Sequence, residues 1–264
     1  MENLYLDGVL AKLNRADDHL KSVQAEVAAF FSRDPYSFGE HLDCEAGKYS
    51  LHIEILEPPP LAWSVVVGDF VHNLRSALDH LAWQLVVVSN AKPSHHTQFP
   101  IFTTEPIGGA PLAKWESMVA GMSAPILKCV RHVQPYTAGA GAKETSLAVL
   151  NRLSNEDKHR LPVARVTAVA RHTTGSIGLI PVRDIQILDA EIATEHPLQD
   201  GDKVAWATVR CTGPEPTVDM KGPVPMHMAF SAGAKDVPMQ GLVDIFEHTQ
   251  VVVGLFEALC RETD

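Results

Sequence analysis

A run of polar side chains between Leu61 and Ser89 combines groups that transfer protons, bind metal ions or form hydrogen bonds in confined sites. At about 100° per residue, these side chains fall within roughly a third of the circumference of a helix. They are Asp69, His72, Asn73, Ser76, Asp79, His80 and Trp83. The polar side of a surface helix usually carries Lys and Glu, so we take this set, the polar stripe, as the leading candidate for a working surface.

One interpretation of the polar stripe is a divalent-metal site. Asp69, His72 and Asp79 are spaced so that their side chains share one helical face, although a second segment must complete the coordination shell. The segment 155–160 could supply Asp157 and His159. This interpretation predicts a metal-dependent hydrolase or lyase that acts on a small molecule. The same groups would also suit hydrogen-bonded support of loops, and segment 155–160 would suit a helix start capped by Asn155.

A second interpretation comes from the segment Arg75-Ser-Ala-Leu-Asp-His80, which has the form R-x-x-x-x-H. It resembles the HEPN family, helical-bundle proteins in which such a segment serves metal-independent RNA cleavage across a homodimer interface. The resemblance implies that His80 acts as a general acid or base toward a ribose 2′-hydroxyl and that Arg75 stabilises developing negative charge. Ser76 and Asp79 would belong to the same catalytic site, and no cofactor would be needed.

A broader resemblance rests on three segments: His72-Asn-Leu-Arg-Ser-Ala-Leu-Asp-His-Leu81, Phe99-Pro-Ile101 and Asp157-Lys-His-Arg160. Together they are similar to a group of uncharacterised bacterial proteins of comparable length, and they bring no function with them. Within these segments or beside them, four residues are candidates for contacting a substrate. They are Asn73, Trp83, Lys158 and Arg160.

Helices must position most of these residues. Apolar residues at helical spacing predict long helices from Leu4 to about Phe31, from Leu61 to about Ser89 and from about Pro238 to Arg261. Shorter helices are expected at about Pro111–Met122, Pro125–Val133 and Thr145–Leu153. The strand-like alternation of Lys48–Ile55 lies between the first two long helices.

Short strand-like runs follow from Leu161 to about Ser231, separated by Gly, Pro and Asp turns. They are Val163–Val169, Ile185–Leu188, Val204–Val209 and Met226–Phe230. We therefore predict an α+β fold in which long helices pack together and an antiparallel β-sheet is inserted before the C-terminal helix. We expect one domain over 1–264, with a helical part of about 1–160 plus 238–264 and a β-rich insertion of about 161–231.

The amino-acid composition and net charge limit the classes of function that the protein can have. The 264 residues include 45% hydrophobic residues, enough for a full core, and the net charge of -10 repels phosphate backbones unless a local basic patch exists. No secretory segment or membrane-length apolar run is evident, which predicts a cytoplasmic protein. The four cysteines are scattered singly, which favours buried reduced thiols.

Among the alternatives we favour HEPN-like RNA cleavage, because that reading assigns roles to both Arg75 and His80. It predicts RNA as substrate, a homodimer and no cofactor. The metal-dependent hydrolase or lyase is the second reading, with a divalent metal and a small-molecule substrate. A non-catalytic module that binds a ligand or a protein is the third.

Overall fold

The structure is a computed structural model that describes residues 5–157, 163–168, 178–192, 198–221, 226–232 and 235–262. Helices combine with antiparallel strands that precede the C-terminal helix, so the expected α+β class is confirmed. The chain divides into two compact units. The helical unit comprises Met1–Gln24, Ala62–Val163 and Ser231–Asp264. The sheet unit comprises Ala25–Leu61 and Ala164–Phe230.

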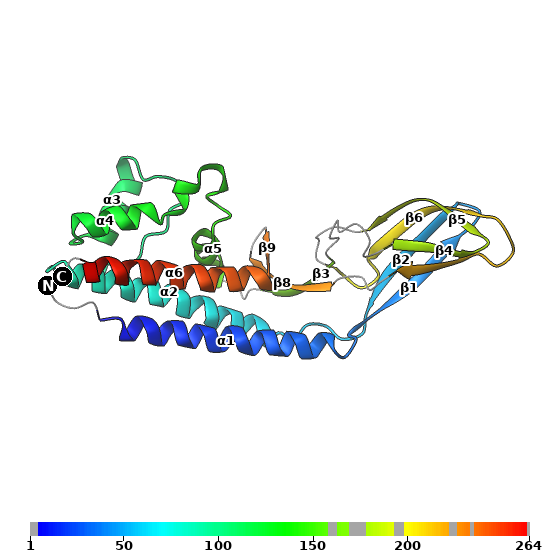
Figure 1. Ribbon diagram of the computed structural model, residues 1–264, viewed down its shortest axis with the longest axis horizontal. Coiled ribbons are helices and arrows are strands. Elements are labelled where there is room, and N and C mark those ends of the chain that lie inside the picture. The colour runs from blue at the N-terminus through cyan, green and yellow to red at the C-terminus, as the bar shows by residue number, and fades with distance from the viewer. Residues whose placement is uncertain are drawn as a thin grey trace. The chain divides into compact units, whose positions relative to one another are not determined.

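The helices match the apolar periodicity of the sequence closely. They are α1 (Asp7–Phe31), α2 (Ala62–Val88), α3 (Gly109–Val119), α4 (Ala124–His132), the short 3-10 helix η1 (Pro135–Gly141), α5 (Ser146–Asp157) and α6 (Met239–Glu262). In the helical unit, α5 lies against α2 and α6, and α2 also contacts α6 (Figure 1). Within the described ranges, no helix has the length and apolar character needed to cross a lipid bilayer.

The central helix α2 forms the core of the helical unit, as its apolar face predicts. Leu74, Leu78, Leu81 and Leu85 are all 0% exposed. Four leucines at this spacing cover one side of a helix, and their burial removes a wide apolar surface from water. The helix ends before Asn90, whose φ of 58° is the left-handed conformation that commonly terminates helices.

Helix α5 is longer than the sequence suggested. It was expected to end near Leu153, with Asn155 capping a new helix start, but the helix continues to Asp157. Asn155 therefore lies in the last turn of α5, and the capping interpretation is wrong. Leu150 and Leu153 are buried on this helix, and so is Ser154 beyond the predicted end, so the packed side of α5 extends past Leu153.

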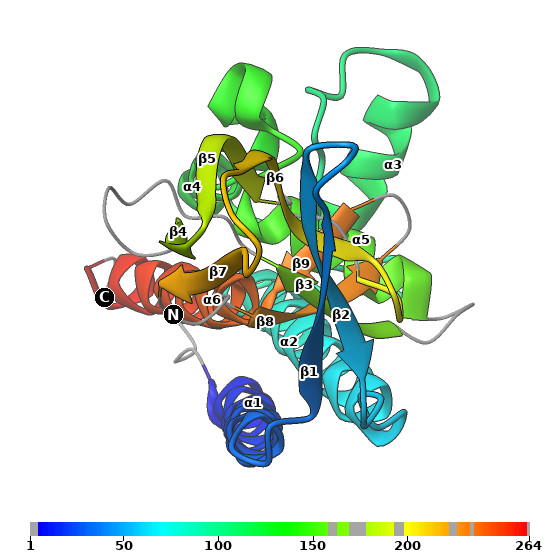
Figure 2. The ribbon, with the colours of Figure 1, turned by 90° about the vertical axis from the view of Figure 1, so that its right-hand side faces the viewer.

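The described strands are β1 (Tyr36–Asp43), β2 (Lys48–Ile55), β3 (Val163–Ala168), β4 (Gly178–Arg183), β5 (Ile185–Ile192), β6 (Lys203–Cys211), β7 (Thr217–Lys221), β8 (Met226–Ala232) and β9 (Lys235–Pro238). A four-stranded sheet has the order β1-β2-β6-β5, and its paired strands are antiparallel (Figure 2). Strands β4 and β7 pair separately, and β3, β8 and β9 form a three-stranded sheet.

The β-rich part includes more of the chain than the expected range of 161–231. Strands β1 and β2 belong to the same sheet as β5 and β6, although they precede α2 in the chain. Strand β1 was not expected because its sequence, YSFGEHLD, shows little apolar alternation and none of its residues is fully buried. Pairing with β2 over the whole strand, from Tyr36 opposite Ile55 to Asp43 opposite Lys48, gives it a place in the sheet.

The sheet unit also corrects the interpretation of the cysteines. Cys44 and Cys211 form a disulfide, with their Cα atoms 5.7 Å apart, so these two are not reduced thiols. Cys129 and Cys260 take part in no disulfide. The bonded pair is separated by 167 positions in the sequence. Sequence spacing could not reveal the pairing, because only the register of β2 with β6 brings the ends of these strands together.

Candidate functional site

Arg75 and Asp79 lie one turn apart on α2 and form an ion pair. Arg75 Nη2 donates to Asp79 Oδ1 at 2.7 Å, and Arg75 Nε donates to Oδ2 at 3.3 Å. The same Nη2 donates to the carbonyl of Phe99 at 2.6 Å, while the Phe99 N–H donates to Asp79 Oδ1 at 3.0 Å. These charge-assisted bonds hold the loop after α2 against the helix and fix the orientation of the guanidinium.

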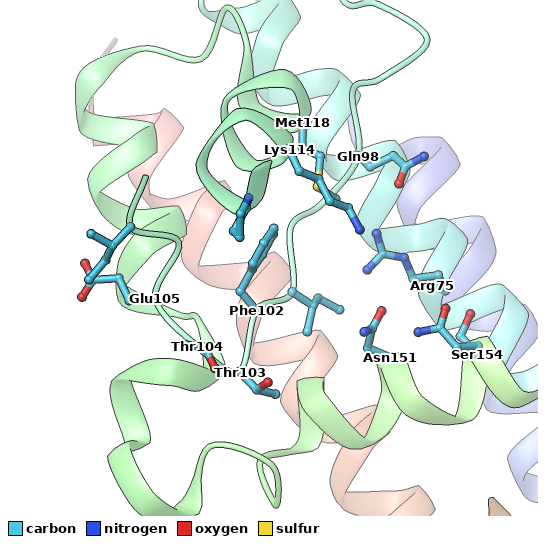
Figure 3. Close-up of a pocket in the computed structure, with 14 residues that line it drawn as sticks. Arg75, Gln98, Phe102, Thr103, Thr104, Glu105, Lys114, Met118, Asn151 and Ser154 are labelled. Carbon is cyan, nitrogen blue, oxygen red and sulfur yellow. The ribbon is translucent and has the colours of Figure 1, made fainter. Parts of the chain in front are cut away.

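The guanidinium of Arg75 points into a cavity of about 630 Å³, which we call the Arg75 cavity (Figure 3). Lys114 of α3 extends toward the same space and ends beside the guanidinium of Arg75, and Asn151 and Ser154 of α5 also line the cavity (Figure 3). The loop 98–107 closes one side with apolar and hydroxyl side chains. The Arg75 cavity therefore combines two cations, neutral hydrogen-bonding groups and an apolar wall.

His80 lines a different cavity, of about 400 Å³, which we call the His80 cavity. Its walls include Trp83 of α2 and Tyr5, whose exposed fractions are 46% and 68%. A Cβ added at Gly8 of α1 would lie 3.1 Å from His80 Nδ1, so the glycine permits the close approach of α1. Five helical positions correspond to about 140° around the axis, so Arg75 and His80 open into separate cavities.

Asp79 stands between the two cavities. One of its oxygens bonds both Arg75 and the Phe99 N–H, and the residue also lines the His80 cavity. Its side chain is 32% exposed. This carboxylate therefore serves primarily to position Arg75 and the following loop, whereas the sequence placed it among catalytic or metal-binding groups.

The structure places Asp157, from the segment 155–160, beside the beginning of α2. A Cβ added at Gly68 of α2 would lie 2.5 Å from Asp157 Oδ1. Burial and the negative charge of Asp69 raise the pKa of Asp157, while the charge of His72 lowers it. Lys158, His159 and Arg160 lie outside the described residues. Among the described residues, no group of three or more His, Cys, Asp or Glu side chains is arranged to hold a metal ion.

The remaining residues of the polar stripe have local hydrogen bonds. Asn73 is buried, and its amide donates to the Asp69 carbonyl at 2.7 Å and accepts from Lys12 of α1 at 3.4 Å. Ser76 Oγ lies 3.5 Å from His72 Nε2. Asn73, assigned from the sequence to substrate contact, therefore links α1 to α2 and faces neither cavity.

Comparison of the chain with family models, with curated proteins and with solved structures found no match.

Several residues of the Arg75 cavity were not singled out from the sequence. Lys114 and Asn151 are ordinary surface residues of amphipathic helices when read along the chain, and Gln98 lies in a loop. No spacing pattern marks them, because each comes from a different element. Phe99 was noted only as part of a resemblance, although its backbone is a direct partner of Arg75 and Asp79.

Proposed function

We propose that the helical unit binds a small organic anion, a carboxylate or a phosphate ester, in the Arg75 cavity. The observation that carries this proposal is the convergence of Arg75 and Lys114 on one cavity (Figure 3). Like charges that face one cavity repel each other, and an anion placed between them removes that repulsion while gaining two charge-assisted contacts. The volume of about 630 Å³ is typical of small-molecule sites.

The hydrogen bonds of Arg75 support a binding role. Nε and Nη2 are engaged by Asp79 and Phe99, whereas Nη1 donates to no group among the described residues and remains available to a ligand. A guanidinium whose orientation is already fixed loses little conformational freedom on binding. Asn151 and Ser154 add neutral donors and acceptors beside it, which would orient the anionic group.

The opposite wall favours a ligand with an apolar body. Ile101, Phe102 and Met118 line the Arg75 cavity, whereas Glu105 lies across the cavity from Arg75 (Figure 3). The carboxylate of Glu105 would repel a second negative charge on the ligand and would attract a polar or cationic substituent. The expected ligand is therefore amphipathic, with one anionic end held between Arg75 and Lys114.

Lys114 provides the sharpest test of the proposal. Its side chain is exposed and forms no hydrogen bond or ion pair with the described residues, so its replacement should leave the fold intact. Thermal shift and calorimetry with aryl and alkyl carboxylates and phosphate monoesters should reveal stabilisation of the wild type. Lys114→Met should weaken binding about tenfold, the effect of roughly 1.4 kcal/mol. Lys128→Met, at an exposed lysine of α4 outside the cavity, should bind as the wild type does. Equal binding of neutral amide analogues would contradict the proposal.

A second candidate function, metal-independent RNA cleavage, is favoured by the surroundings of His80. The exposed imidazole shares a cavity with Tyr5 and Trp83, and exposed aromatic side chains can stack on unpaired bases. Arg75 opens into the other cavity of the same chain. The HEPN-like mechanism would therefore need a homodimer in which a second copy brings its own Arg75 to His80.

Incubation with single-stranded RNA in the presence of EDTA tests this second candidate and separates it from the metal-dependent alternative. Cleavage in EDTA should fall about 100-fold or more in His80→Ala, through loss of proton transfer. His132→Ala, at an exposed histidine of α4, should leave cleavage unchanged. The net charge of -10 opposes RNA binding, and intact RNA after incubation with the wild type would exclude this candidate.

A further inference from the structure

The outer face of the four-stranded sheet carries an exposed tryptophan on an inner strand. Trp206 of β6 is 37% exposed and lies opposite Ser50 of β2, which lies opposite His41 of β1. The alternate residues Ala205 and Ala207 are buried in the core on the other face. A large aromatic side chain thus stands in a row of polar residues, on the side of the sheet that its own core does not use.

This face is hollowed around Trp206. A depression of about 530 Å³ is lined by residues of β1, β2 and β6, among them Trp206, Ser50, His41, Asp43 and Lys48. All these elements belong to the sheet unit. The lining offers an aromatic surface together with an imidazole, a hydroxyl, a carboxylate and an ammonium group, so hydrogen-bond donors and acceptors are both present.

The hydrogen bonds of His52 determine whether the Ser50 hydroxyl acts as a donor or as an acceptor. His52 Nδ1 lies 2.9 Å from the carbonyl oxygen of Gly201, which can only accept, so Nδ1 carries the proton. In the neutral ring Nε2 is then an acceptor, and it takes the hydroxyl proton of Ser50 at 3.0 Å. Ser50 is only 8% exposed, and after this donation its hydroxyl oxygen can still act as an acceptor.

We propose that this face of the sheet binds a neutral carbohydrate, with one sugar ring lying on Trp206. The C–H groups of a pyranose carry small positive charges and suit the negative face of an aromatic ring. Its hydroxyl groups both donate and accept, which matches a lining of mixed donors and acceptors. Neither Arg75 nor His80 takes part, so this inference does not depend on the function proposed for the helical unit.

Charge favours a neutral sugar over a nucleic acid at this face. A strand of nucleic acid would also stack on Trp206, but it needs a positive surface along its backbone. Here Lys48 and Lys203 are accompanied by Asp43 in the lining, and Glu191 lies directly opposite Trp206 on β5. The protein as a whole has a net charge of -10, which repels polyanions.

Tryptophan fluorescence of the full chain tests the proposal directly. Trp63 and Trp115 are buried, at 2% and 1% exposure, so in a Trp83→Phe variant Trp206 is the one exposed tryptophan. Neutral oligosaccharides of glucose, N-acetylglucosamine, galactose and mannose serve as probes at millimolar concentration. We expect at least one of them to protect Trp206 from acrylamide quenching and to shift its emission.

The affinity of the protecting oligosaccharide is then measured by calorimetry. Trp206→Ala should weaken it about tenfold or more, as expected for the loss of an aromatic platform. Val182→Ala removes an exposed apolar side chain of β4 that is absent from the lining and should leave the affinity unchanged. Absence of protection by every neutral probe would overturn the proposal. So would salt-sensitive binding of oligouridylate or dextran sulfate in place of neutral sugars.

Discussion

The two units of the chain place their polar side chains in opposite ways. In the helical unit, Arg75, Asp79 and Asn73 of the central helix turn toward neighbouring elements and are held by hydrogen bonds to α1 and to the loop at Phe99. In the sheet unit, polar residues occupy the outer face of a sheet whose other face supplies the core. A helix surrounded by neighbours directs polar groups toward several other elements, whereas a sheet presents them in rows along one face.

The two units also differ in the interactions that stabilise them. The helical unit depends on α2, whose leucines are completely buried. The sheet unit has its own apolar core, which includes Leu51, Ile53 and Val204, and it is also linked by the Cys44–Cys211 disulfide. We therefore expect apolar packing to dominate in one unit and covalent restriction of the unfolded chain to contribute strongly in the other.

The largest expected effect comes from Leu78→Ala in α2. Leu78 is 0% exposed, so its truncation should lower the free energy of unfolding by about 2–5 kcal/mol through lost burial and a cavity. Urea unfolding in a Trp206→Phe background measures this change, because every remaining tryptophan then lies in the helical unit. Val65→Ala, on the same helix but 48% exposed, should cost less than about 0.5 kcal/mol. Equal losses in the two variants would contradict the assignment of the buried face.

The disulfide should have the next largest effect, and it should act on the sheet unit. Replacing Cys44 and Cys211 together by Ala should lower the free energy of unfolding by about 2–4 kcal/mol. Trp206 is the only tryptophan of this unit, so its fluorescence follows the relevant transition.

A thiol count provides the control for the disulfide prediction. In denaturant without reductant, Ellman's reagent should label Cys129 and Cys260, which are outside the disulfide, and should label all four cysteines after reduction. Four reactive thiols before reduction would show that the bond does not form in the isolated protein. In that case the double variant should unfold like the wild type.

The smallest expected effect concerns Asp157 at the end of α5. Its pKa is raised above the ordinary value of 3.8, so the folded protein binds this proton more tightly than the unfolded chain does. The resulting stabilisation is complete below pH 3.8 and is lost as the pH rises through the folded pKa. At neutral pH, Asp157→Asn should therefore raise stability, by less than about 1 kcal/mol because solvent screens the charges.

Thermal unfolding at pH 7 and near pH 3.5 checks this sign. The advantage of Asp157→Asn should largely disappear at the lower pH, where the wild-type carboxyl is mostly protonated in both states. Glu156→Gln, at the preceding position of α5, is the matched control and should show no comparable gain. A stability loss in Asp157→Asn at pH 7 would indicate that the ionised carboxylate has a favourable partner.

Periodicity in the sequence determined the fold class and the central helix. The spacing of Leu74, Leu78, Leu81 and Leu85 by itself predicted which face of α2 is buried, because a continuous apolar side has no stable position in water. The long terminal helices and strands β2, β5, β6 and β8 were also foreseen from their patterns. Strand β1 was missed, since a poorly alternating segment becomes a strand only when a partner satisfies its backbone.

Tertiary structure alone decided which polar groups meet. The motif from Arg75 to His80 suggested one joint site, but the rotation of the helix directs the two side chains into different cavities. The contact of Asp157 with the start of the polar stripe was predicted, whereas Lys114, Asn151 and the Phe99 backbone were not. Side chains that converge from separate elements leave no spacing signal along the chain. For the same reason, the Cys44–Cys211 bond depended on strand register, which the positions of single cysteines do not encode.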